Sequence, residues 1–140
     1  MYGQNPYNNY KETQIKTASS EKLLLMLFDG GLKFMKQAKG HLENKELKQA
    51  NEKLKRAQSI VAELMNSLDT NQGEVATNLW RLYDFMLNEL IQANIKKDTE
   101  KIDQVMKMMR ELRQTFDEAS KSAGSGKNVK TQAGGIVGKA

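Results

Sequence analysis

Cysteine is absent from this 140-residue chain, which also has a single proline, a single histidine and a single tryptophan. The lack of cysteine excludes disulfides and thiol chemistry, and it is compatible with a reducing compartment. The near-absence of proline leaves long helices uninterrupted, because proline breaks a helix interior. The chain also lacks a long apolar run and an apolar N-terminal stretch that would suit a signal peptide. We therefore expect a cytoplasmic protein without a stable membrane insertion.

Residue types that carry catalysis or bind metals are also scarce. His41 is the sole histidine, and a di-iron bundle would need a glutamate three residues before it, where Ala38 stands. The sequence contains no cluster of zinc ligands, no glycine-rich phosphate-binding loop and no nucleophile motif. We expect no catalytic residue, no metal site and no cofactor. A metal- or cofactor-dependent enzyme stays the alternative of a different class.

The net charge of +5 is concentrated near the C-terminus. Four lysines follow Glu118, the last acidic residue: Lys121, Lys127, Lys130 and Lys139. Without them, 18 basic residues face 17 acidic ones, which argues against nucleic-acid binding by the body of the protein. Residues 123–140 are rich in Gly and Lys and predict a flexible basic tail. That tail either touches an anionic lipid surface weakly or aids solubility.

Apolar residues recur every three or four positions in four segments, as in amphipathic helices. The first three span residues 20–42, 45–68 and 74–95, with a turn expected at residues 69–73, and the fourth follows Asp98, its expected cap. Because short links between helices of similar length favour antiparallel neighbours, we predict an all-α fold. The fold is an antiparallel up-down four-helix bundle over residues 19–122, preceded by an arm at residues 1–18. Gly30 and Gly31, inside the first helix, predict either a close helix approach or a local bend.

The first and third helices contain more apolar residues than a bundle helix with one solvent-exposed face requires. The expected core stripes include Leu47 in the second helix and Val75 in the third, and the third helix carries a second apolar row beside its stripe. The surplus residues are Trp80, Leu87 and Ile91 in the third helix and Leu23, Leu27 and Phe34 in the first. Either these helices are the more buried pair, or the arm, a partner or another copy covers the surplus.

Three of the four tyrosines lie in the first ten residues: Tyr2, Tyr7 and Tyr10. Tyrosine is amphipathic and loses little side-chain freedom when it docks, so the arm is a candidate lid over a groove. The alternative is that the tyrosines are scattered through a disordered terminus. As a lid, Tyr7, Tyr10 and Ile15 would cover part of the groove until a partner displaced them.

Four short motifs follow one another along the chain: TASSE at residues 17–21, LFDG at 27–30, LYDFM at 82–86 and Ala93-Asn94. In order and spacing they resemble the T-A-S-P-E, L-Y-D-G, L-Y-D-Y-M and A-N of the flagellin export chaperones of the FliS type. Asn51, Ala57 and Glu63-Leu64 also fall where that pattern places them, and the resemblance covers roughly residues 1–117. Ser20 replaces the family's proline, and Phe28 and Phe85 replace tyrosines.

The resemblance implies a chaperone that binds the C-terminal segment of flagellin, prevents premature polymerisation and delivers it to the flagellar type III export gate. Amphipathic helices dock into apolar grooves through anchors spaced i, i+3 or i+4, and i+7. We expect the client to pack on Leu79, Tyr83, Leu87 and Ile91. The alternative is a structural or adaptor bundle that self-associates, for example as a homodimer, without a flagellin client.

Overall fold

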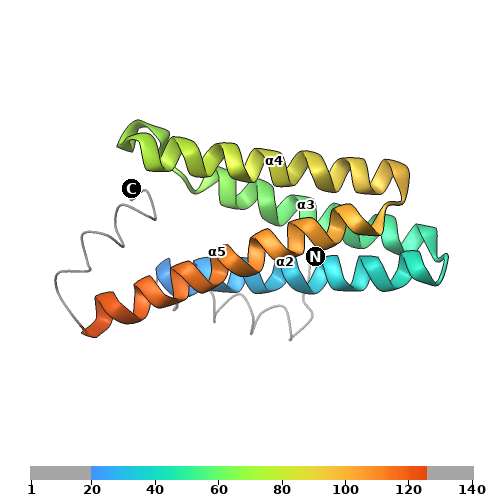
Figure 1. Ribbon diagram of the computed structural model, residues 1–140, viewed down its shortest axis with the longest axis horizontal. Coiled ribbons are helices and arrows are strands. Elements are labelled where there is room, and N and C mark those ends of the chain that lie inside the picture. The colour runs from blue at the N-terminus through green and yellow to red at the C-terminus, as the bar shows by residue number, and fades with distance from the viewer. Residues whose placement is uncertain (1–19, 126–140) are drawn as a thin grey trace, which may run out of the picture.

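The computed structural model describes residues 20–125, which form four α-helices and a short 3-10 helix (Figure 1). They are α2 (Ser20–Glu43), α3 (Leu47–Asn66), η1 (Thr70–Gln72), α4 (Glu74–Lys96) and α5 (Thr99–Ser125). Each long helix contacts the next one along the chain, and α2 also contacts α5, so the four helices close into an up-down bundle. The predicted all-α, antiparallel four-helix bundle is confirmed. The N-terminal arm at residues 1–18, Ser19 of the predicted bundle and most of the basic tail lie outside the described residues.

Side-chain caps and a residue with positive φ mark the helix boundaries where the sequence predicts turns. The Asp69 carboxylate accepts a hydrogen bond from the Asn71 amide at 3.0 Å, and Gly73 has a φ of +119° that suits glycine. Asp98 accepts from the Glu100 amide at 2.9 Å and caps α5 as predicted. At its other end α5 continues to Ser125, beyond the boundary predicted at residue 122.

The core is built mainly from the predicted apolar stripes. Its largest fully buried side chains include Phe28, Met35, Leu54, Leu64, Met86, Leu90, Ile102 and Met109. Leu47 and Val75 were predicted in these stripes but are about half exposed, because each lies in the first turn of its helix, at an end of the bundle. Nearer the middle of α4, the core instead takes in Tyr83, which is 1% exposed.

Two neighbouring glycines let α2 approach the helices on either side of it. A Cβ atom added to Gly31 would lie 2.7 Å from Sδ of Met109 in α5, well inside normal contact. One added to Gly30 would lie 3.1 Å from Cδ1 of Ile60 in α3. Because both glycines stand inside the continuous helix α2, their role is close packing rather than a break. Of the two interpretations drawn from the sequence, close approach is confirmed.

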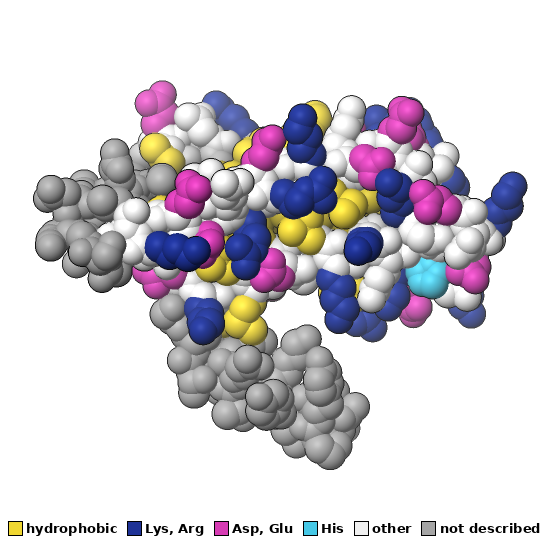
Figure 2. Space-filling model, turned by 60° about the horizontal axis from the view of Figure 1, so that its bottom comes forward, with side chains coloured by type: hydrophobic (Ala, Val, Ile, Leu, Met, Phe, Trp, Pro, Cys, Tyr) yellow, Lys and Arg dark blue, Asp and Glu magenta, His cyan; other side chains and the backbone are white. Residues whose placement is uncertain are grey.

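The surface of the bundle mixes charges of both signs. Figure 2 shows a face on which basic and acidic side chains are interspersed around small hydrophobic areas, in agreement with the near balance of charge. Within residues 20–125, no helix is long and apolar enough to cross a membrane.

Candidate partner-binding surface

Two polar contacts establish which side of α4 faces which neighbour. Nδ2 of Asn94 donates to Oδ1 of Asn51 in α3 at 2.6 Å. On another side of α4, Oε1 of Glu89 accepts from Nζ of Lys101 in α5 at 3.3 Å. The Asn94 side of α4 therefore borders α3, and the Glu89 side borders α5.

The surplus apolar residues of α4 lie on its α3 side. Leu87 and Trp80 precede Asn94 by seven and fourteen residues, and seven residues return a helix to nearly the same face. Ile91 precedes Asn94 by three and joins them. We call Trp80, Leu87 and Ile91 the α4 row. Trp80 is 39% exposed, and the other two are half-buried, so the row offers apolar surface to a partner.

The surplus residues of α2 also border α3. The Phe34 ring lies beneath two cations of α3, with 5.7 Å from its centroid to Nζ of Lys53 and 5.6 Å to Cζ of Arg56. Leu27 and Leu23 precede Phe34 by seven and eleven residues and share its face. We call Leu23, Leu27 and Phe34 the α2 row, and all three are half-buried. The two apolar rows thus lie on either side of the same helix.

The predicted partner-binding residues divide into several groups in the structure. Leu87 and Ile91 belong to the α4 row. Leu79, like Leu87, is half-buried and packs against the core, but it lies nearer the core side of the helix. Tyr83 lies within the core, and burial raises the pKa of its phenol above the ordinary value. The four predicted positions are spaced by four residues, and each such step rotates about 40° beyond one full turn of the helix. The set therefore shifts gradually from the core side of the helix to its surface side. The candidate surface therefore omits Tyr83. The arm residues Tyr7, Tyr10 and Ile15 lie outside the described part of the chain.

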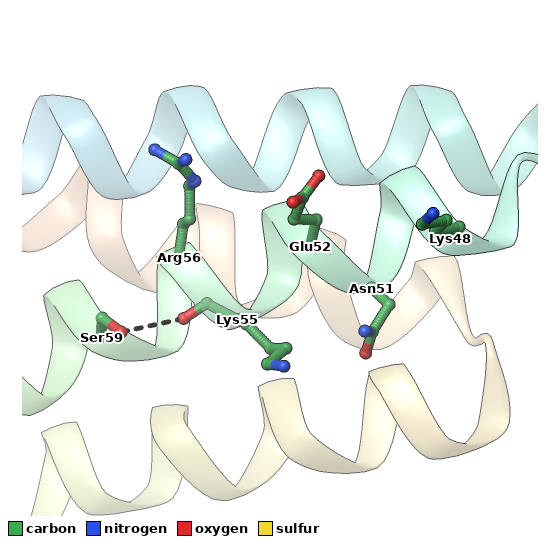
Figure 3. Close-up of a pocket in the computed structure, with 6 residues that line it drawn as sticks. All are labelled: Lys48, Asn51, Glu52, Lys55, Arg56 and Ser59. Carbon is green, nitrogen blue, oxygen red and sulfur yellow. Dashed lines mark hydrogen bonds between the residues drawn. The ribbon is translucent and has the colours of Figure 1, made fainter.

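The outward face of α3 completes the surface between the two rows. Six of its side chains line an open hollow of about 370 Å³: Lys48, Asn51, Glu52, Lys55, Arg56 and Ser59 (Figure 3). Figure 3 shows this face of α3 running between α2 and α4. Apart from Asn51, which belongs to the FliS pattern, these residues were not predicted from the sequence, because a charged face of an amphipathic helix has the same pattern whether or not it binds a partner.

The described residues offer binding surface rather than reaction chemistry. Within residues 20–125, no group of three or more His, Asp or Glu side chains is placed to hold a metal ion. Nδ1 of His41 lies 2.7 Å from Oε1 of Glu46, at the turn between α2 and α3. That contact bridges the turn and gives His41 a structural role.

Comparison with known proteins assigns this bundle to a family. The family model described as "Flagellar protein FliS" matches residues 3–123. The chain belongs to the FliS family.

Individual relatives carry the same family name. A FliS-family relative in Bacillus subtilis (strain 168), named "Flagellar secretion chaperone FliS", is 37% identical over 119 residues, which are 85% of this chain and 89% of the relative. "Flagellar secretion chaperone FliSB" of Pseudomonas aeruginosa is 31% identical and covers 84% of this chain and 97% of its own. The FliS of Salmonella typhimurium, also named a flagellar secretion chaperone, is 33% identical over 80% of this chain and 84% of its own.

Most residues of the FliS motifs noted in the sequence pack in the core or join two helices of the bundle. Asp29 of LFDG accepts hydrogen bonds from Arg113 of α5 at 2.7 and 3.2 Å. Tyr83 of LYDFM is a core residue, and Asn94 joins α4 to Asn51 of α3. These motif residues hold helices together, while the α2 and α4 rows form the partly exposed apolar surface.

Proposed function

We propose that this FliS-family protein is a cytoplasmic export chaperone. It binds the C-terminal segment of flagellin, prevents its premature polymerisation and delivers it to the flagellar type III export gate. The names of its relatives as flagellar secretion chaperones support this role. The observation that carries the proposal is the pair of half-buried apolar rows on either side of α3.

The geometry of the rows suits a helical client. The three residues of the α4 row are separated by seven and four positions, which are the spacings through which amphipathic helices anchor in grooves. A disordered segment that folds on binding loses about 2–5 kcal/mol in ordering and typically buries about 1,000–3,000 Å². One row is too small for such an area, so the client uses both rows, one on each side of α3.

The N-terminal arm is the proposed lid of this surface. In the free protein, Tyr7, Tyr10 and Ile15 cover part of the α4 row, and the client displaces them. Deletion of residues 1–12 then leaves the bundle folded while it raises the affinity for the client or promotes self-association. A truncated protein with unchanged affinity and unchanged oligomeric state would contradict the lid but leave the chaperone role intact.

The function is tested by isothermal titration calorimetry with the full-length protein. The ligand is a peptide of roughly 40 residues from the C-terminus of flagellin of the same bacterium, long enough for the expected burial. We expect one-to-one binding with a clearly negative change in heat capacity, because apolar surface is buried. An intact peptide that gives no heat at several temperatures would overturn the proposal.

Self-association is the second candidate function, and an exposed aromatic residue favours it. Phe85 precedes Glu89 by four residues, so it lies on the α5 side of α4, away from the α4 row, and it is 50% exposed. A structural bundle would use this residue between copies. Sedimentation at several concentrations distinguishes the two functions, since a structural oligomer persists when the flagellin peptide is added and a chaperone forms a one-to-one complex.

A further inference from the structure

The outward face of α3 carries four cationic side chains without an acidic partner: Lys48, Lys53, Lys55 and Arg56. Within residues 20–125, none of these side chains forms an ion pair or a hydrogen bond. Glu52 lies within one helical turn of Lys48, Lys55 and Arg56, yet it also stays outside ion-pair distance of them. Charges that are not used inside the protein remain available to a partner.

The side chains of this face spread apart around the hollow. Figure 3 shows Arg56 and Glu52 pointing toward α2, whereas Lys55 and Asn51 point toward α4. The Ser59 hydroxyl donates a hydrogen bond to the Lys55 carbonyl oxygen at 3.1 Å. The hollow is therefore open at its centre and bordered by cationic groups.

Aromatic contacts hold two of the cations in place. Arg56 and Lys53 lie over the Phe34 ring at 5.6 and 5.7 Å from its centroid, and Lys33 of α2 lies at 6.0 Å. A cation–π contact positions a guanidinium without occupying its hydrogen-bond donors. Arg56 is thus ordered in advance, and its N–H groups stay available to a planar acceptor such as a carboxylate.

We propose that the α3 face is a docking site for an acidic protein segment, in addition to the apolar client surface. Carboxylates of that segment pair with Lys48, Lys55 and Arg56. Lys48 and Lys55 are seven residues apart, about 10.5 Å along the helix axis. A helix with glutamates at i and i+7, lying alongside α3, presents its carboxylates at the same spacing. Glu52, at the middle of the face, accepts a hydrogen bond from an amide or a basic group of the partner.

Charge distribution favours a protein segment over a lipid surface or a nucleic acid. Those polyanions need a broad cationic surface, whereas residues 1–120 carry only one more basic than acidic residue. Glu52 would also repel a continuous row of phosphates. A segment with a few spaced carboxylates matches the three cations and avoids this repulsion.

The site is tested by titrating isotope-labelled, full-length protein with a synthetic helical peptide and following its amide resonances by NMR. The peptide carries glutamates at i, i+4 and i+7, and a second peptide carries glutamines there. We expect shifts centred on residues 48–59, an affinity that falls on going from about 50 to 300 mM salt, and binding roughly tenfold weaker for the glutamine peptide. An absence of shifts at residues 48–59, or equal binding of both peptides, would overturn the proposal.

Two charge-reversal variants separate this site from general charge effects. The double variant Lys48→Glu/Lys55→Glu should weaken binding of the glutamate peptide by roughly tenfold or more. The control Lys36→Glu/Lys107→Glu makes the same charge change at exposed positions on α2 and α5 and should change the affinity less than about twofold. Equal losses in the two variants would mean non-specific attraction. Inorganic phosphate or phosphatidylserine vesicles that displace the peptide through the same two lysines would reassign the site to phosphate ligands.

Discussion

The helices α3 and α5 lie on different sides of the bundle and are joined to their neighbours in different ways. Within residues 20–125, every ion pair of a lysine or arginine that crosses between two helices involves α5. These pairs are Arg113 with Asp29, Lys39 with Asp103, and Lys101 with Glu89. The inter-helix side-chain hydrogen bond of α3 is the Asn51–Asn94 contact, and the cations of its outward face have no acidic partner.

This difference indicates which side of the protein is available for partners. Around α5, three ion pairs join this helix to α2 and α4, and the bond to Asp103 raises the pKa of Lys39 above its ordinary value. Around α3, two apolar rows remain half-buried, and exposed apolar surface lowers the free energy when a partner covers it, by about 25 cal/mol per Å². The α5 side is thus linked internally by ion pairs between helices, whereas the α3 side combines apolar and charged groups that a partner can use.

The largest expected effect is on client binding and compares two aromatic residues of α4. Trp80→Ala removes the most exposed anchor of the α4 row and should weaken flagellin-peptide binding by roughly 2 kcal/mol, about thirtyfold. Phe85→Ala, on the α5 side, should leave affinity nearly unchanged. Calorimetry with both variants is the measurement. Equal losses would mean that the client does not distinguish the two sides.

The next effect tests the close approach of α2 and α5. Gly31→Val places methyl groups where Met109 already fits tightly, so the free energy of unfolding should fall by roughly 1–3 kcal/mol. Gly40→Val is the matched control, because a Cβ added at Gly40 meets nothing within 4 Å. Urea denaturation measures both variants. If Gly31→Val were no more destabilising than its control, the contact with α5 would not be tight.

A third prediction concerns Tyr83, the core residue that the sequence placed on the surface. Burial raises the pKa of its phenol, whereas the unfolded chain releases this proton near pH 10. The stability that Tyr83 contributes is therefore complete below pH 10 and is lost as the pH rises from there toward the higher pKa of the folded protein.

Urea denaturation at pH 9 and pH 11 checks this pH dependence. Between these values the wild type should lose about 1 kcal/mol more than Tyr83→Phe, which has no phenol to ionise. Tyr83 is the only tyrosine among residues 20–125, so the difference reports on a single described group. Identical pH dependence in the two proteins would show that Tyr83 is accessible to solvent.

The smallest effect compares one paired and one unpaired cation. Arg113→Gln breaks the contact with Asp29 and should lower the free energy of unfolding by roughly 0.2–1 kcal/mol, less at high salt. Lys55→Gln should have almost no effect, because Lys55 has no ion-pair partner among the described residues. Thermal unfolding at low and high salt measures both. A larger loss for Lys55→Gln would contradict the contrast between the two sides.

Local patterns in the sequence predicted the helices and most of the core. The cap at Asp98, the turn at residues 69–73 and the buried positions of α2 depend on neighbours along the chain, which a sequence displays directly. Gly30 and Gly31 marked a special position but not its purpose. Close approach became evident only when Met109, distant in the sequence, was seen beside Gly31.

The candidate surface was harder to predict because it combines three helices. The sequence identified the extra apolar residues of the first and third helices, but spacing alone did not show whether Tyr83 faced the core or the solvent. The overall charge balance of the body also concealed the unpaired cations of α3. An average over the chain cannot show that Arg113 and Lys101 of α5 have acidic partners within ion-pair distance whereas the cations on the outward face of α3 have none among the described residues.

The sequence by itself determined four amphipathic helices, their order and the FliS motifs, because periodicity and caps act between residues close in the chain. Only the tertiary structure decided that the α2 and α4 rows lie on either side of α3, and that cations without partners lie between them. The physical reason is rotation: packing in the bundle sets the direction of each helix face, and that rotation depends on contacts between residues far apart in sequence.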